Sequence, residues 1–92
     1  MTIQPVSATE GVLSLSQPVL ANDEMHFSAF GPGWGFCSYA LPAALVVARL
    51  GAANLSEQQL NLAFQVNRLR ITQVVIEAGT SETGERVRLK EI

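Results

Sequence analysis

Apolar residues recur at helical spacing through residues 55–79, the longest regular pattern in the chain. Ser56 is placed to cap the start of a helix, and Gln59 three residues later completes a capping box. Gly79 follows the last apolar residue and supplies a left-handed stop. About 22 residues at 1.5 Å each predict a single helix roughly 33 Å long. We expect the fold to be organised around this helix.

The predicted helix has two apolar stripes on opposite sides. The first stripe is wide enough to lie on a sheet: Leu60, Phe64, Ile71, Val75 and Ala78. The second stripe faces the other way: Leu62, Val66, Leu69 and Ile76. A surface helix needs only one apolar stripe, so either another helix of this chain or a second copy should cover the second one.

Alternation of apolar and polar residues predicts strands at 11–16, 25–30, 36–41 and 86–92. A short helix is expected to start at Pro42 and to end at Gly51. Together these elements predict an α+β fold in β-β-β-α-α-β order. We expect an antiparallel sheet of three to four strands, packed on one face by the short and the long helix. Residues 1–92 should form one small domain, with residues 1–10 loosely ordered.

Three glycines and a proline at 31–35 predict a hairpin loop between the second and third strands. A phosphate cradle would need a helix directly after the glycines, and a strand is expected there instead. Trp34 at the tip has two interpretations: it folds back on the sheet, or it stands out as a binding anchor.

Composition narrows the possible locations and partners. The net charge of −2 gives no strong electrostatic footprint for nucleic acid. No early basic residue precedes an apolar run as in a secretory signal, and the longest apolar run, 40–48, is too short to span a membrane. We therefore expect a cytoplasmic protein with no membrane contact.

The chain shows no motif that carries chemistry. Cys37 is the only cysteine and His26 the only histidine, and neither has a catalytic or metal-ligand partner at a recognised spacing. A buried thiol and a partly exposed strand residue are the simpler interpretations. We expect no enzyme activity, no metal and no cofactor.

The last predicted strand places Arg86, Arg88 and Lys90 on one face. These bases could contact an anion or nucleic acid, or they could be a charged edge that resists strand pairing.

The chain from about Leu13 onward resembles a family of short bacterial proteins, the domain of unknown function number fourteen eighty-eight. The resemblance rests on His26-Phe27-Ser28-Ala29-Phe30, on residues 45–51, on Leu60-x-x-x-Phe64-x-x-x-Arg68-x-x-Ile71, and on Gly84 with Val87 and Leu89. It implies a small α+β fold in the bacterial cytoplasm. It supplies no catalytic or binding residue, because the family has no assigned activity.

The function expected from these patterns is a non-enzymatic accessory or protein-interaction domain. The expected interface residues are Leu62, Val66, Leu69, Ile76 and Trp34, with a second copy or an unidentified protein as the partner. The alternative is an anion- or nucleic-acid-binding module that uses Arg86, Arg88 and Lys90.

Overall fold

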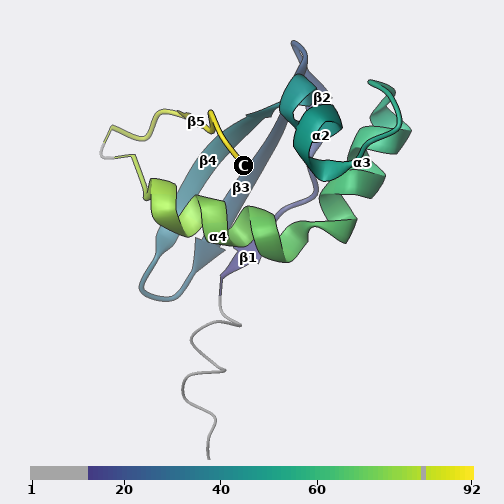
Figure 1. Cartoon of the computed structure of the whole chain (residues 1–92). Helices are drawn as coiled ribbons and strands as arrows, with labels where there is room; N and C mark the ends of the chain where they lie inside the picture. The colour runs from purple at the N-terminus through teal and green to yellow at the C-terminus, as the bar shows by residue number, and fades with distance from the viewer. Residues whose placement is uncertain (1–12, 82) are drawn as a thin grey trace, which may run out of the picture.

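A hairpin of two long strands forms the centre of the sheet in the computed structural model, which describes residues 13–81 and 83–92 (Figure 1). Strand β3 (Glu24–Gly31) pairs antiparallel with β4 (Gly35–Pro42). Alternate side chains of both strands are buried in the core: Met25, Phe27, Ala29, Cys37, Tyr39 and Leu41. The strands predicted at 25–30 and 36–41 are confirmed, each with one further residue at either end.

Two short strands flank β3 on its other side. Both β1 (Ser14–Leu15) and β2 (Val19–Ala21) pair with it antiparallel. Asn22 and Asp23, with φ of 53° and 63°, make the turn from β2 into β3. The alternation at 11–16 predicted β1, but β2 was not predicted. The expected loose order of residues 1–10 lies outside the described residues.

The five-stranded sheet is mixed, which corrects the prediction of an antiparallel sheet. Strand β5 (Val87–Arg88) runs parallel to β4, with Val87 opposite Tyr39. The helices between β4 and β5 return the chain to the end of the sheet where β4 begins, and a crossover of this kind joins parallel neighbours. Alternation at 86–92 predicts a strand, of which only Val87–Arg88 forms, and alternation does not give the strand's direction.

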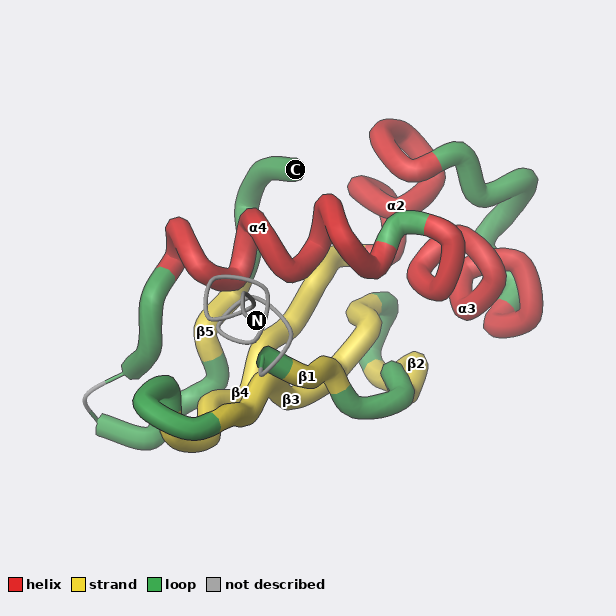
Figure 2. The backbone as a smooth tube through the Cα atoms, turned by 90° about the horizontal axis from the view of Figure 1, so that it is seen from below, coloured by secondary structure: helices red, strands yellow, loops and turns green. Residues whose placement is uncertain are grey.

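The helices lie on one face of the sheet, as predicted (Figure 2). They are α2 (Ala43–Leu50), α3 (Glu57–Val66) and α4 (Arg68–Ala78). Gly51, with φ of 82°, ends α2, and the Ser56 hydroxyl accepts a hydrogen bond from the Gln59 N–H at 3.3 Å. The α+β class agrees with the sequence analysis, and the order of elements agrees roughly: the structure adds strand β2 and divides the long helix into two. The opposite face of the sheet carries the other alternate residues of β3 and β4, which are polar at His26, Ser28 and Ser38 and aromatic at Phe30 and Phe36.

The prediction of a single long helix over 55–79 is wrong: the helix breaks at Asn67. Asn67 has φ −107° and ψ 23°, where a helix needs ψ near −42°. Its side-chain amide donates to the Ala63 carbonyl at 2.8 Å and to the Leu50 carbonyl at 3.2 Å. The side-chain amide thus competes with backbone N–H groups for the Ala63 carbonyl, and it also hydrogen-bonds Leu50, the last residue of α2. The helix break therefore depends on a hydrogen bond to a residue 17 positions earlier in the sequence. Helical periodicity cannot predict a contact of this kind.

Asn67→Ala tests this bond. The variant loses both amide contacts and leaves a carbonyl of α2 without a donor, so we expect the free energy of unfolding to fall by about 1–2 kcal/mol. Gln73→Ala on the exposed side of α4 is the control and should change it by less than about 0.5 kcal/mol. Urea unfolding followed by circular dichroism measures both. Equal stability of the two variants would mean that the Asn67 amide does not hold α2 against the helix break.

Candidate functional site

The second apolar stripe of the helices is the largest exposed apolar feature among the expected site residues. Its four side chains are between 52% and 76% exposed: Leu62, Val66, Leu69 and Ile76. Leu69 and Ile76, two turns apart on α4, border a hollow of about 290 Å³ together with Thr72 and Gln73. We call these four residues the outer helix face.

Four of the five residues of the first stripe are fully buried, as predicted: Leu60, Phe64, Ile71 and Val75 have no exposed surface. The prediction is wrong for Ala78, which is exposed at the last position of α4. No residue in the described ranges covers the outer helix face, and α2 does not reach it. The sequence analysis predicted that either another helix of this chain or a second copy covers this face. No other helix in the described residues does so. Coverage by a second copy stays a prediction.

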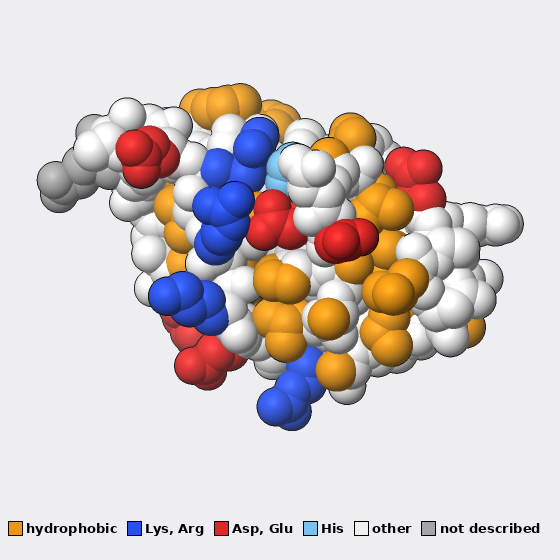
Figure 3. Space-filling view, turned by 90° about the horizontal axis from the view of Figure 1, so that it is seen from above, with side chains coloured by type: hydrophobic (Ala, Val, Ile, Leu, Met, Phe, Trp, Pro, Cys, Tyr) orange, Lys and Arg blue, Asp and Glu red, His pale blue; other side chains and the backbone are white. Residues whose placement is uncertain are grey.

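Arg86, Arg88 and Lys90 are all exposed along β5 and the residues beside it. Figure 3 shows Lys and Arg side chains in a row beside the histidine and a carboxylate. The Arg88 Nε donates to one oxygen of Glu24 at 3.1 Å, and the His26 ring lies 3.0 Å from the other oxygen. The hydrogen bond to His26, followed by the bond to Arg88, lowers the pKa of Glu24. One of the three bases is thus already paired, and the pair ties β5 to β3.

Trp34 lies half-buried against the core at the β3–β4 turn. Its backbone N–H donates to the Gly31 carbonyl at 3.0 Å, and its indole N–H is buried with no hydrogen-bond partner in the described structure. Of the two interpretations of Trp34, this arrangement is the one in which the ring folds back on the sheet. Trp34 lies between β3 and β4 in the chain, whereas the other four expected interface residues lie on α3 and α4.

His26 acquires a carboxylate neighbour that the sequence analysis did not anticipate, so an enzymatic site has to be considered. A hollow of about 330 Å³ lies beside His26 and Ser28, with Arg86 at its border. No hydroxyl or thiol within the described residues hydrogen-bonds His26, so a nucleophile–base pair is not assembled there. Cys37 is buried and unpaired on the opposite, core-facing side of β4.

Sequence analysis missed a pair of exposed aromatic rings. Phe30 and Phe36 stack across the hairpin with centroids 6.3 Å apart, and Phe36 is 70% exposed. Their alternation with the buried residues of β3 and β4 placed them on the outer face of the sheet. What it could not show was that nothing in the described chain covers them.

The comparisons with known proteins give no relative: no protein-family model, no curated protein and no solved structure matches the chain. Among the described residues, no helix is long and apolar enough to cross a membrane. In the same residues, no group of three or more His, Cys, Asp or Glu side chains gathers that could hold a metal ion.

Proposed function

We propose that this protein is a small, non-enzymatic interaction domain that self-associates through the outer helix face. The observation that carries the proposal is the exposure of Leu62, Val66, Leu69 and Ile76 on helices whose other side forms the core. Large apolar side chains exposed on neighbouring helices cost free energy in water, and such surfaces are often interfaces. The resemblance stated above favours a bacterial, cytoplasmic setting for this domain.

The geometry of the face supports pairing of two copies. Leu62 and Val66 are one turn apart on α3, and Leu69 and Ile76 are two turns apart on α4, so each pair lies on one side of its helix. The hollow beside Leu69 and Ile76 offers a place for an apolar side chain of a second molecule. A two-fold pair would bury the same patch from both copies, because the interface of a symmetric dimer is self-complementary.

Binding of an anion or a nucleic acid by Arg86, Arg88 and Lys90 is the less supported alternative. Glu24 already occupies Arg88, and the net charge of −2 works against a polyanion. Replacing Arg86 and Lys90 with glutamine should abolish salt-sensitive binding of a single-stranded oligonucleotide if this alternative holds.

Native mass in solution tests self-association. We expect a dimer at tens of micromolar by analytical ultracentrifugation, and we expect Leu69→Glu to raise the dissociation constant by about tenfold or more. A charge buried without a partner in an apolar contact is strongly unfavourable. Val19→Glu is the matched control, because Val19 is comparably exposed but lies on β2.

The control should leave the mass unchanged, and both variants should keep the wild-type circular dichroism spectrum. A strict monomer at these concentrations would overturn the proposal. So would a dimer that Leu69→Glu does not weaken.

A further inference from the structure

Strand β5 has one edge that no described residue covers. The Leu89 N–H donates to the Ala40 carbonyl at 2.8 Å, which fixes the side of β5 that faces β4. Backbone polar groups alternate in direction along a strand, so the Arg88 N–H and C=O point away from β4. Strand β5 is the last strand in the order β1-β3-β4-β5, and these groups are therefore free to pair with an added strand.

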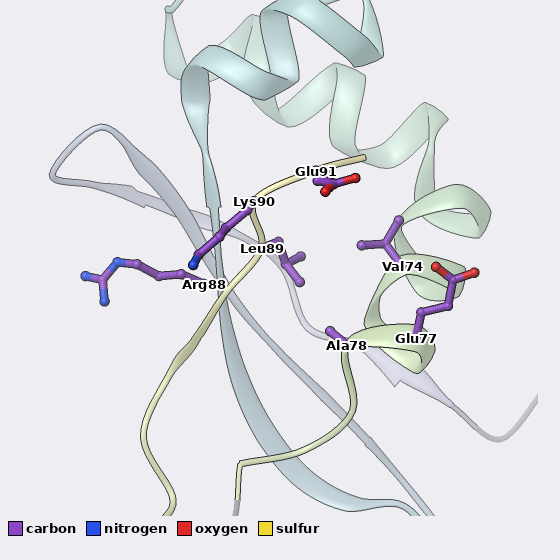
Figure 4. Close-up of a pocket in the computed structure, with 7 residues that line it drawn as sticks. All are labelled: Val74, Glu77, Ala78, Arg88, Leu89, Lys90 and Glu91. Atoms are coloured by element: carbon purple, nitrogen blue, oxygen red, sulfur yellow. The ribbon is translucent and has the colours of Figure 1, made fainter.

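An apolar-floored groove runs between this edge and α4. It has a volume of about 390 Å³, and Val74 and Ala78 of α4 and Leu89 form its floor. Figure 4 shows Leu89 pointing toward Val74 and Ala78, whereas Arg88 and Lys90 extend in the opposite direction. A strand added to β5 would thus place alternate side chains over the groove and over the basic face.

The groove and the basic face, on which an added strand would place its alternate side chains, differ in charge. Arg86 and Lys90 are exposed on the basic face, on either side of Arg88, while Glu77 and Glu91 border the groove. Acidic side chains of an added strand are attracted on the basic face and repelled at the groove. Apolar side chains fit the floor of the groove formed by Val74, Ala78 and Leu89.

We propose that the outer edge of β5 is a docking site for an extended segment of another protein in which acidic and apolar residues alternate. Main-chain hydrogen bonds to Arg88 supply binding, and the alternation supplies specificity. The site is separate from the outer helix face and does not depend on self-association.

A second copy of β5 is not the occupant that the charges favour. Antiparallel pairing of two β5 strands would bring Arg86, Arg88 and Lys90 of one copy opposite the same bases of the other. Like charges directly across a strand pair are destabilising. The charged edge thus disfavours its own copies while it attracts an acidic strand.

A short fluorescent peptide of alternating valine and glutamate tests the proposal against a peptide with lysine in place of glutamate. We expect the acidic peptide to bind the full-length chain at least tenfold more tightly by anisotropy, and rising salt to weaken that binding. Amide hydrogen exchange should slow at Arg88 when the acidic peptide is present. Arg86→Gln with Lys90→Gln should weaken binding about tenfold, and Arg49→Gln on α2 is the control that should not.

Two substitutions at Arg88 separate backbone pairing from charge. Arg88→Ala and Arg88→Pro both lose the bond to Glu24, but only proline removes the outward N–H, and an edge strand tolerates proline at such a position. We expect Arg88→Pro to bind the acidic peptide about tenfold more weakly than Arg88→Ala. If the proline variant does not fold, the exchange rate of the wild-type Arg88 amide decides.

The proposal is overturned if the two peptides bind equally, if neither binds, or if the Arg88 amide gains no protection on binding. Binding of a single-stranded oligonucleotide in place of the acidic peptide, without protection of that amide, would also overturn it and would assign the bases to an anion site.

Discussion

Phe64→Ala is expected to destabilise the protein by about 3–5 kcal/mol, the usual cost of removing a fully buried phenylalanine side chain. Phe64 has no exposed surface. Its ring packs edge-on against Phe27 with centroids 5.0 Å apart, and the Arg68 guanidinium lies 5.9 Å from its centre. A domain of this size has a total stability of roughly 5–14 kcal/mol, so this one change removes a large share of it.

Val66→Ala, two residues further along the same helix, should shift the free energy of unfolding by less than about 0.5 kcal/mol because Val66 is 75% exposed. Urea unfolding of both variants at low micromolar concentration compares the two faces directly. A small effect of Phe64→Ala, or equal effects of the two changes, would show that the helices do not pack on the sheet through the first stripe.

The regular elements followed from the sequence because their signals are local. Alternation at 25–30 and 36–41 and the glycines between them define the central hairpin, and helical spacing separates the buried side of the helices from the exposed side. The break at Asn67 was missed because its second hydrogen-bond acceptor, the Leu50 carbonyl, belongs to a different helix. Only the folded chain brings that acceptor to Asn67.

The candidate sites divide in the same way. Periodicity alone identified the outer helix face, since exposure follows from the angle of each residue around the helix. The role of Arg88 could not be predicted, because its partner Glu24 is 64 residues away in sequence. The groove beside β5 was equally invisible, because α4 and β5 form it only when β5 pairs parallel to β4.

Tyr39 should make the protein sensitive to alkaline pH. Its side chain is fully buried, and its hydroxyl donates to the Gly79 carbonyl at the end of α4 at 2.6 Å. Burial, and then its neighbour Cys37, raises the pKa of the Tyr39 hydroxyl well above its usual value of 10.0. The folded state therefore holds this proton after the unfolded chain has lost it. The resulting stabilisation is complete below pH 10 and falls as the pH rises toward the folded pKa.

Each pH unit above 10 should cost the wild type on the order of 1 kcal/mol until the folded protein itself loses the proton. Tyr39→Phe lacks both the titration and the bond to Gly79, so it should be about 1 kcal/mol less stable than the wild type at pH 8. The two stability curves should therefore cross between pH 10 and pH 12.

Urea unfolding across this range measures the crossing. Because Tyr39 is the only tyrosine, tyrosinate absorbance reports its ionisation without interference. Parallel curves, or ionisation near pH 10 in the folded protein, would contradict the buried hydrogen bond that joins Tyr39 to α4.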